Sequence, residues 1–339
     1  MTTIYDIAKK TGYSPTTVSK VFNNYTDVRA QTRQTILQAA KEMGYLPNAH
    51  ARTLTTKKSW TIGVLFVESS GIGMQHPFFS AVIESFKQVA VSKGYALMFI
   101  SKDVGGKQSG YLENCKIRGV DGVVVILSDY EDPYFKELLD SDIPCVILDY
   151  ETSQAHTVYS DNLEGSLLAV EYLYSLGHRK IAHISGGMNT FAGSNRVRGY
   201  ELAMASLDLE RQESYIIDSA YYSIESGYAA MMKLLNLEKR PTAVFVAGDH
   251  LALGAMRATK ERGLRIPEDM SIVGFDNIEL SQYITPALTT IAQDTALMGT
   301  EAAEMLIRSI DDPSYVLEAL VLPVKLVVRD SCSSVTSVE

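Results

Sequence analysis

The strongest constraint on the fold is a long alternation of apolar runs and amphipathic helical stretches that begins at Ser59. The apolar runs include TIGVLFV, GVVVIL and AVFVAG, whose unbroken hydrophobicity is typical of buried parallel strands. Between the runs lie stretches with helical periodicity, such as FFSAVIESFKQVAVSKG. This alternation predicts doubly wound α/β sheets. Because about 270 residues exceed one typical domain, we expect two subdomains in this region.

Residues 1–58 show a different pattern, in which short helices are separated by turn residues. Thr3 and Asp6 have the spacing of a capping box at the start of a first helix. Gly12 is expected to end that helix. Ser14 and Pro15 are expected to begin a second one, because serine caps free N–H groups and proline suits the first helical position. Two helices joined by a glycine turn predict a helix-turn-helix, although an ordinary antiparallel helix pair has the same spacing.

The second and third helices of this region each have one apolar side. The second, PTTVSKVF, is expected to bury Val18 and Val21 and to leave Thr16, Thr17 and Lys20 on its other side. The third, QTRQTILQAAKEM, has the apolar residues Ile36, Leu37, Ala40 and Met43 and is expected to end at Gly44. The region therefore resembles a small three-helix head.

The distribution of charge separates this head from the rest of the chain. The 339 residues carry a net charge of −9, which by itself argues against a nucleic-acid partner. Residues 1–60, however, contain nine Lys and Arg and only three Asp and Glu, a net of +6, which leaves −15 for the remainder. A basic head on an acidic body favours a nucleic-acid contact through the head alone.

Several classes of protein are disfavoured by what the sequence lacks. It contains no apolar run of the roughly 18 residues that a membrane helix needs, and its N-terminus does not resemble a signal peptide. The three cysteines form no CxxC pair, which favours a reduced, cytoplasmic protein without a cysteine metal site. VGGKQS and SGIGMQH are incomplete versions of phosphate- and dinucleotide-binding loops, and neither HExxH nor GxSxG occurs. We therefore expect no enzyme activity, no metal and no cofactor.

The sequence resembles the LacI/GalR family of bacterial repressors. The resemblance rests on the runs TIYDIA, GYS, TVSKVFN, GYLPN and ARTL, which lie between residues 3 and 54, and it continues through nearly the whole chain. It implies an all-α helix-turn-helix head over residues 1–47 and a hinge helix over 48–58. It further implies a two-lobed α/β domain over 59–330, like that of periplasmic binding proteins, which binds effector and dimerises. Residues 331–339 are expected to form a disordered tail.

The resemblance also implies which residues contact DNA. They are Ser14, Pro15, Thr16, Thr17, Ser19, Lys20, Asn23, Tyr45, Ala51, Arg52 and Leu54. Thr16 and Lys20 would face base edges in the major groove, whereas Pro15 departs from many relatives because its side chain has no hydrogen-bonding group. Ser14, Ser19, Asn23 and Tyr45 would contact phosphates. Ala51, Arg52 and Leu54 suit a minor-groove contact, in which a small residue, a cation and an apolar wedge bend a base step.

Ligands of doubly wound sheets bind beyond the carboxyl ends of the strands. By resemblance, the residues that face an effector there are Phe78, Phe79, Ser128, Asp149, Arg196, Tyr222 and Asp276. This set suits a sugar, because carboxylates and arginine bind hydroxyl groups and aromatic faces cover C–H patches. Asp249 is expected to be a helix cap instead. Gly248 departs from relatives, which often carry a hydrogen-bonding side chain at this position.

The sequence therefore predicts a transcriptional repressor that binds a near-palindromic operator as a homodimer and responds to a small effector, most simply a sugar. A dimer is preferred to a tetramer because the chain ends in VRDSCSSVTSVE, without a leucine heptad. Three alternatives stay open. The effector could be a purine-like corepressor, or the regulating partner could be a phosphorylated carrier protein. The chain could also be a sugar-binding module with a vestigial head.

Overall fold

The computed structural model describes residues 2–22, 25–45, 58–67 and 73–335. The chain divides into two compact units, one formed by residues 1–61 with 119–121 and the other by 62–118 with 122–339. Among the described residues, no helix has both the length and the apolar character that crossing a membrane requires.

The first unit contains the three helices expected for the head, α1 (Ile4–Thr11), α2 (Pro15–Phe22) and α3 (Ala30–Glu42). The capping box is present: Thr3 Oγ1 accepts a hydrogen bond from the Asp6 N–H at 3.3 Å, and the Asp6 carboxylate accepts one from the Thr3 N–H at 2.8 Å. Gly12 ends α1 in the left-handed conformation, with φ 75°. Ser14 Oγ accepts from the Thr17 N–H at 3.1 Å at the start of α2.

The head has a small core that the three helices share. Ile7, Val18, Val21 and Ile36 are at most 1% exposed. The apolar residues of α3 do not all face this core: Leu37 is 45% exposed, whereas Ala39 is buried. The physical reason is helical periodicity, because the buried stripe of α3 runs through positions 36, 39 and 40 and continues to the partly buried Met43. Leu37 lies about 100° around the helix from Ile36 and so faces away from that stripe.

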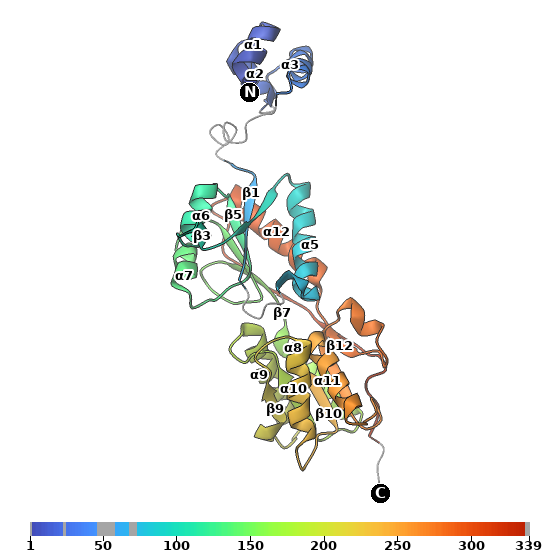
Figure 1. Cartoon of the computed structure of the whole chain (residues 1–339). Helices are drawn as coiled ribbons and strands as arrows, with labels where there is room; N and C mark the ends of the chain where they lie inside the picture. The colour runs from blue at the N-terminus through green and yellow to red at the C-terminus, as the bar shows by residue number, and fades with distance from the viewer. Residues whose placement is uncertain (1, 23–24, 46–57, 68–72, 336–339) are drawn as a thin grey trace. The chain divides into compact units, whose positions relative to one another are not determined.

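The second unit has two lobes, each built on a six-stranded sheet (Figure 1). The N-terminal lobe has the strand order β13-β7-β6-β5-β1-β2. Its strands are β1 (Thr61–Phe66), β2 (Ala96–Ile100), β5 (Gly122–Leu127), β6 (Cys145–Leu148), β7 (His156–Ser160) and β13 (Ala319–Leu322). On one side α5 (Pro77–Ser92) packs against α12 (Thr295–Asp311), and on the other α6 (Tyr111–Arg118) packs against α7 (Pro133–Leu139). The short strands β3 (Asp103–Val104) and β4 (Lys107–Gln108) form a hairpin.

The C-terminal lobe has the strand order β14-β12-β11-β10-β8-β9. Its strands are β8 (Ile181–Ser185), β9 (Ile216–Asp218), β10 (Ala243–Val246), β11 (Ser271–Asp276), β12 (Thr289–Ala292) and β14 (Lys325–Val327). Its helices are α8 (Asn162–Ser175), α9 (Phe191–Ser206), α10 (Ile224–Leu235) and α11 (Asp249–Glu261). Helices α8 and α9 pack together, as do α10 and α11. β14 is antiparallel to β12, whereas the other pairs are parallel.

The chain passes from one sheet to the other after β7, after β12 and after β13. Each lobe is therefore discontinuous in sequence, as the resemblance implied. The crossings also bring strand ends of the two lobes near each other, because β7 and β12 each finish where the chain leaves their sheet. The predicted two-lobed α/β architecture is confirmed.

The end of the chain differs from the expectation of a disordered tail. The Ser331 carbonyl accepts a hydrogen bond from the Ile272 N–H at 2.9 Å, and Ser331 Oγ accepts one from the Thr289 N–H at 2.8 Å. Further on, the Val335 N–H donates to the Leu176 carbonyl at 2.9 Å. The expectation was wrong for residues 331–335, because their serines and backbone groups bind the C-terminal lobe. The domain boundary expected at 330 therefore moves to at least 335, and residues 336–339 lie outside the described residues.

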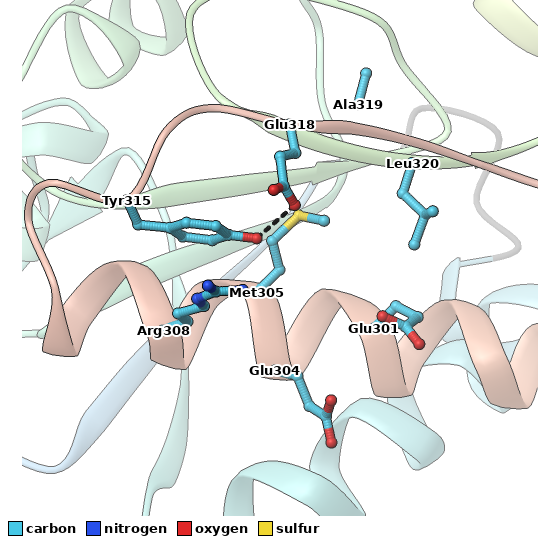
Figure 2. Close-up of a pocket in the computed structure, with 8 residues that line it drawn as sticks. All are labelled: Glu301, Glu304, Met305, Arg308, Tyr315, Glu318, Ala319 and Leu320. Carbon is cyan, nitrogen blue, oxygen red and sulfur yellow. Dashed lines mark hydrogen bonds between the residues drawn. The ribbon is translucent and has the colours of Figure 1, made fainter.

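The N-terminal lobe also has a hollow of about 420 Å³ between α12 and the segment that leads into β13 (Figure 2). It is lined by Glu301, Glu304, Met305, Arg308, Tyr315, Glu318, Ala319 and Leu320. The Tyr315 hydroxyl donates to the Glu318 carboxylate at 2.6 Å, and the Arg308 guanidinium lies 4.3 Å from the centre of the Tyr315 ring. With three carboxylates and one guanidinium, the lining carries a negative formal charge. It includes none of the residues expected to contact an effector.

Candidate functional sites

The surface of α2 presents the side chains that were expected to face DNA bases. Thr16 is exposed, and Pro15, Thr17 and Lys20 are half-buried. The Lys20 ammonium forms an ion pair with Asp27. Its Nζ lies 6.0 Å from the centre of the Tyr25 ring. The hydrogen bond from Lys20 lowers the pKa of Asp27 below its usual range. In the absence of DNA, therefore, the principal candidate base-reading cation is held by a carboxylate of its own head.

The expected phosphate-contacting residues of the head have additional structural contacts. Ser14 and Thr17 share a hydrogen bond of 2.9 Å between their hydroxyls, so they form the exposed start of α2. Ser19 is half-buried. Tyr45 packs against Phe22 with ring centres 5.0 Å apart, and burial raises the pKa of Tyr45. The remaining predicted DNA-contacting residues, Asn23, Ala51, Arg52 and Leu54, lie outside the described residues.

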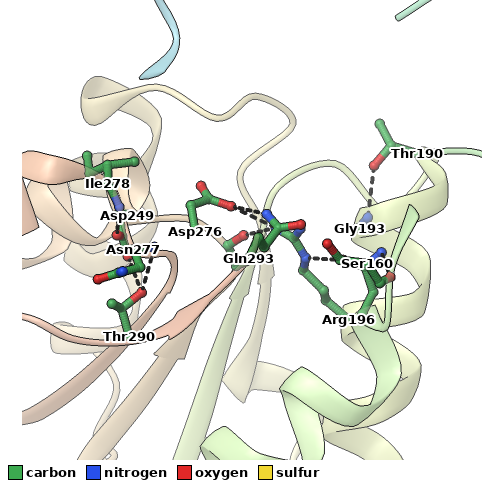
Figure 3. Close-up of polar contacts among 12 residues, drawn as sticks. Ser160, Thr190, Gly193, Arg196, Asp249, Asp276, Asn277, Ile278, Thr290 and Gln293 are labelled. Atoms are coloured by element: carbon green, nitrogen blue, oxygen red, sulfur yellow. Dashed lines mark hydrogen bonds and ion pairs between the residues drawn. The ribbon is translucent and has the colours of Figure 1, made fainter. Parts of the chain in front are cut away.

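In the C-terminal lobe, Arg196 lies at the centre of a buried polar cluster (Figure 3). It is 3% exposed, and its Nε donates to Asn162 Oδ1 at 2.8 Å. One terminal nitrogen donates to the Ala247 carbonyl and lies 3.9 Å from Asp276 Oδ1. Gln293 Nε2 donates to the same Asp276 oxygen at 2.7 Å. The cluster thus joins α8, α9, β11 and the residue that follows β12.

Asp276 ends β11 in a backbone conformation that is rare for a residue with a side chain, with φ 110°. Burial raises the pKa of Asp276 to about 6, although the nearby charge of Arg196 opposes this rise. Such strained, electrostatically perturbed carboxylates are concentrated at binding sites. The structure therefore supports Asp276 as a site residue and not as an ordinary turn aspartate.

Asp249 has a different role from the expected helix cap. Gly248 is the N-cap of α11, and the Asp249 carboxylate accepts hydrogen bonds from the Ile278 N–H at 2.9 Å and the Thr290 hydroxyl at 2.6 Å (Figure 3). Burial and the charge of Asp276 raise the pKa of Asp249 well above its usual range. The cap expectation was wrong because this side chain points toward β12 and the loop after β11. Asp249 thereby supports the loop that follows Asp276.

The N-terminal lobe contributes the carboxylate of Asp149, a half-buried residue that directly follows β6. Asp149 has φ 50°, and burial raises its pKa while the charge of Arg196 lowers it. Asp149 Oδ1 has no hydrogen-bond partner among the described residues. The same holds, within the described part of the chain, for the hydroxyls of Ser128 and Tyr130, which follow β5. The effect of Asp149 on the pKa of Asp276 places the two carboxylates in one electrostatic environment.

Aromatic rings from both lobes lie beside these carboxylates. The His76 ring, before α5, is 4.8 Å from that of His250 in α11 and 6.5 Å from that of Tyr222, measured between centres. Phe79 contacts His76 at 5.4 Å. Phe78 instead belongs to the buried stripe that α5 presents to the core, one turn before Val82. Of the two predicted phenylalanines, Phe79 is therefore the one whose ring contacts His76.

Sequence reasoning missed several residues of this cluster, namely Asn162, Gln293, Ser160, Tyr130, His76 and His250. Gln293 directly follows β12, and Ser160 is the last residue of β7. Their position at the carboxyl end of a buried strand was therefore a signal already available in the sequence. Asn162, two residues after the end of β7, carried the same signal. The two histidines did not, because only packing between different parts of the chain brings them here. The described residues contain no group of three or more His, Cys, Asp or Glu side chains that could hold a metal ion.

Comparisons with known proteins match both parts of the chain. Residues 3–48 match the family model described as bacterial regulatory proteins, lacI family, and residues 170–332 match the periplasmic binding protein-like domain. The HTH-type transcriptional repressor PurR of Vibrio cholerae serotype O1 (strain M66-2) is 36% identical over 343 residues, which cover 99% of each chain. The protein of the same name from Edwardsiella ictaluri (strain 93-146) is 37% identical over 98% of this chain and 97% of the relative.

The chain belongs to the lacI family of bacterial regulatory proteins. Its fold agrees, since the lac repressor dimer bound to operator and the anti-inducer ONPF matches with a TM-score of 0.84, at 30% identity over 98% of this chain and 99% of that one. The transcriptional regulator CelR in complex with cellobiose matches with a TM-score of 0.72, at 28% identity over 98% and 100%. The head is therefore the DNA-binding domain of a lacI-family transcriptional repressor, and the two-lobed unit is its periplasmic-binding-protein-like domain.

Proposed function

We propose that this repressor is controlled by a polyhydroxylated, sugar-like effector that binds at the carboxylates Asp149 and Asp276. The observation that carries the proposal is a set of buried polar atoms that lack hydrogen-bond partners within the described residues. They are Ser128 Oγ, Tyr130 OH, Asp149 Oδ1, Ser160 Oγ, Tyr222 OH and Gln293 Oε1. In the N-terminal lobe, these residues follow β5 or β6 or end β7. In the C-terminal lobe, Gln293 follows β12 and Tyr222 lies in the loop before α10.

Buried polar atoms without partners are costly and are rare in native proteins, so a set of them in one region indicates a ligand that completes their hydrogen bonds. The set mixes acceptors, such as Asp149 and Gln293, with hydroxyls that both donate and accept. A sugar hydroxyl also both donates and accepts, so neighbouring hydroxyls satisfy such a mixture. The structural neighbour with bound cellobiose and a lacI-family regulator from Enterococcus faecium with bound ribose support the same class of ligand.

A purine corepressor is the second candidate, and the name PurR of the matched relatives favours it. A purine ring presents N–H donors and ring-nitrogen acceptors, and its flat face suits aromatic neighbours. The rings around His76 meet at 55° to 85°. Tyr130 stacks on Tyr150 at 8°, but with 3.7 Å between ring centres these two faces leave no space for a purine between them. We therefore place the sugar-like effector first.

A phosphorylated carrier protein has less support as the regulating partner. A phosphoryl group favours arginine and lysine clusters. The hollow on α12 is lined by three glutamates, and its arginine already lies over the ring of Tyr315. The hollow therefore repels a phosphoryl group more than it attracts one.

We propose further that the protein acts as a homodimer on a two-fold symmetric operator, through binding and without catalysis. The structural neighbour is described as a dimer bound to operator, which supports this assembly. Effector binding between the lobes would shift the equilibrium between two lobe arrangements, and that shift would alter the affinity for DNA. A purine corepressor would raise operator affinity, whereas an inducing sugar would lower it.

The experiment that tests the proposal measures operator binding by fluorescence anisotropy with the full-length chain. D-ribose, cellobiose and guanine are added separately, and a thermal-shift assay reports their binding to the free protein. A change in operator affinity and melting temperature with either sugar, abolished by Asp149→Asn, supports the proposal. A response to guanine alone would overturn it in favour of the purine corepressor.

A further inference from the structure

The ring of Tyr222 occupies space that two glycines leave open. A Cβ atom at Gly186, which follows β8, would lie 2.0 Å from Cζ of Tyr222 and 2.2 Å from its Cε1. A Cβ atom at Gly248, which precedes α11, would lie 2.9 Å from Cδ1 of the same ring and 3.5 Å from Asp276 Oδ2. Any side chain at either position would therefore have to displace the tyrosine ring.

The backbone conformation does not require glycine at either position. Gly248 has φ −171° and ψ 148°, an extended conformation that any residue adopts. Gly186 also lies outside the positive φ region in which side chains are strained. Neither glycine is needed for a left-handed turn, so the requirement comes from the neighbouring ring. We define the Tyr222 slot as the space between Gly186 and Gly248.

The slot directs the Tyr222 hydroxyl into the polar cluster. The hydroxyl is buried and has no hydrogen-bond partner among the described residues. Burial raises the pKa of Tyr222 to about 12, so the phenol is neutral and keeps a proton to donate. The charges of Arg196, Asp149 and Asp276 all act on this hydroxyl, which places it beside the carboxylates of both lobes. On the other side, His76 meets the ring nearly edge to face, with an angle of 85°.

We propose that Gly186 and Gly248 determine effector specificity by forming the Tyr222 slot. The Tyr222 hydroxyl, and not a side chain at position 248, then provides the hydrogen bond at this end of the site. Gly186 and Gly248 are positioning residues, whereas Tyr222 touches the effector. An effector for this site presents a hydrogen-bonding group to the phenol and a flat C–H or aromatic face to its ring. The proposal rests on the effector site proposed above, but not on the choice between sugar and purine.

A double-mutant cycle separates this role from a general need for glycine. We compare Gly248→Ala, Tyr222→Ala and the double variant with the unsubstituted full-length protein. If the slot exists for the tyrosine ring, Gly248→Ala lowers the melting temperature by about 2 to 4 °C when Tyr222 is present. In the Tyr222→Ala background the same change has little effect, because the ring it would strike is gone. Equal effects in both backgrounds would overturn the proposal.

The second arm measures D-ribose, cellobiose and guanine binding by isothermal titration calorimetry. For whichever probe binds the unsubstituted chain, Gly248→Ala is expected to weaken binding at least tenfold, and Tyr222→Phe about fivefold, since it removes only the hydroxyl. Again, Gly248→Ala should have little further effect once Tyr222 is alanine. Additive losses would contradict the proposal.

The two arms keep this proposal distinct from the proposed function. If none of the three probes binds the unsubstituted chain, the proposed effector class is wrong. The melting-temperature cycle then tests the proposed Tyr222 slot by itself. Coupled effects of Gly248→Ala and Tyr222→Ala on stability support the slot, and additive effects overturn it. If folding of Gly248→Ala fails, Gly248→Ala in the Tyr222→Ala background still reports whether the ring caused the failure.

Discussion

The DNA-contacting head and the effector-binding unit present their candidate functional residues in different ways. In the head, the described candidate contacts lie between residues 14 and 45, and exposed or half-buried side chains present them on short capped helices. In the larger unit, the candidate residues lie between 76 and 293, and strand ends of two sheets bring most of them together. The comparison teaches that a DNA surface needs exposed cations on a rigid local scaffold, whereas a small-ligand site needs distant polar groups removed from water.

The energetic consequences differ as well. The ion pair between Lys20 and Asp27 is exposed to solvent, so it contributes little to stability and leaves the lysine free to exchange partners. The Arg196 cluster is buried, so each of its members depends on the others for desolvated hydrogen bonds. Substitutions should therefore affect DNA affinity in the head and both stability and effector response in the larger unit.

The largest expected effect comes from Arg196→Ala. It leaves Asp276 and Asn162 buried without their cationic partner, which should lower the free energy of unfolding by about 3 to 5 kcal/mol. Urea denaturation followed by circular dichroism measures this loss. Arg198→Ala is the matched control, because Arg198 lies on the same helix but is exposed. If both variants lose the same small amount, Arg196 does not anchor a buried cluster.

Next in size is the pH dependence of stability that Asp276 causes. Its pKa is raised to about 6 in the folded protein, so the folded protein keeps this proton up to a higher pH than the unfolded chain does. The contribution of this group is therefore fully present below its unfolded pKa near 4 and is lost as pH rises through about 6. The loss is about 1.4 kcal/mol for every pH unit that separates the folded from the unfolded pKa. Asp276→Asn should flatten the fall in stability between about pH 4 and pH 7.

The same variant should keep operator binding and lose the response to effector, because Asp276 lies in the two-lobed unit. Denaturation at a series of pH values and operator titrations with effector measure these outcomes. The control is Asp142→Asn, which alters an exposed carboxylate of the same unit. An unchanged pH profile, or a normal effector response, would refute the assignment of Asp276.

In the head, Lys20→Ala should weaken operator binding by about 1 to 3 kcal/mol, because it removes a donor to a base edge. It should leave the melting temperature nearly unchanged, since the Lys20 ion pair is exposed. Anisotropy titrations against the operator and a scrambled duplex measure both affinity and specificity. Lys93→Ala, in the effector-binding unit, is the control. Equal losses on both duplexes would indicate that Lys20 contacts only phosphates.

The smallest expected effect belongs to Asp27→Asn. Releasing Lys20 from its carboxylate partner removes a competitor for DNA, so operator affinity should rise by less than about threefold. The gain should shrink with added salt, because salt screens the exposed pair. A salt titration of both proteins measures this difference. A fall in affinity would mean that Asp27 orients Lys20 instead of competing with DNA.

The hinge remains a prediction from sequence alone. Leu54→Ala is expected to leave the fold intact and to weaken operator binding, because the apolar wedge into the minor groove is lost. Gel-shift titration at constant salt measures the operator affinity. Leu37→Ala serves as the control, since Leu37 is an exposed leucine on α3. Unchanged affinity for Leu54→Ala would remove the wedge from the mechanism.

The sequence by itself determined the three head helices, their caps at Thr3, Gly12 and Ser14, the two-lobed α/β architecture and the family. The helices and their caps depend on neighbours within about four residues, so a short window contains them. The two lobes and the family came instead from the long alternation of strands and helices and from a resemblance that runs through nearly the whole chain. The family resemblance also predicted that Asp149, Arg196 and Asp276 lie together, and the structure places their charges within reach of one another; that they bind an effector stays a prediction.

Only the tertiary structure decided that Asp249 supports a loop instead of capping a helix, that Phe79 and not Phe78 contacts His76, and that residues 331–335 bind the C-terminal lobe. The same is true of the tyrosine ring that explains Gly186 and Gly248. Each of these depends on which distant segment packs against a residue. Sheet order and the crossings between lobes set those neighbours, and no local pattern in the chain records them.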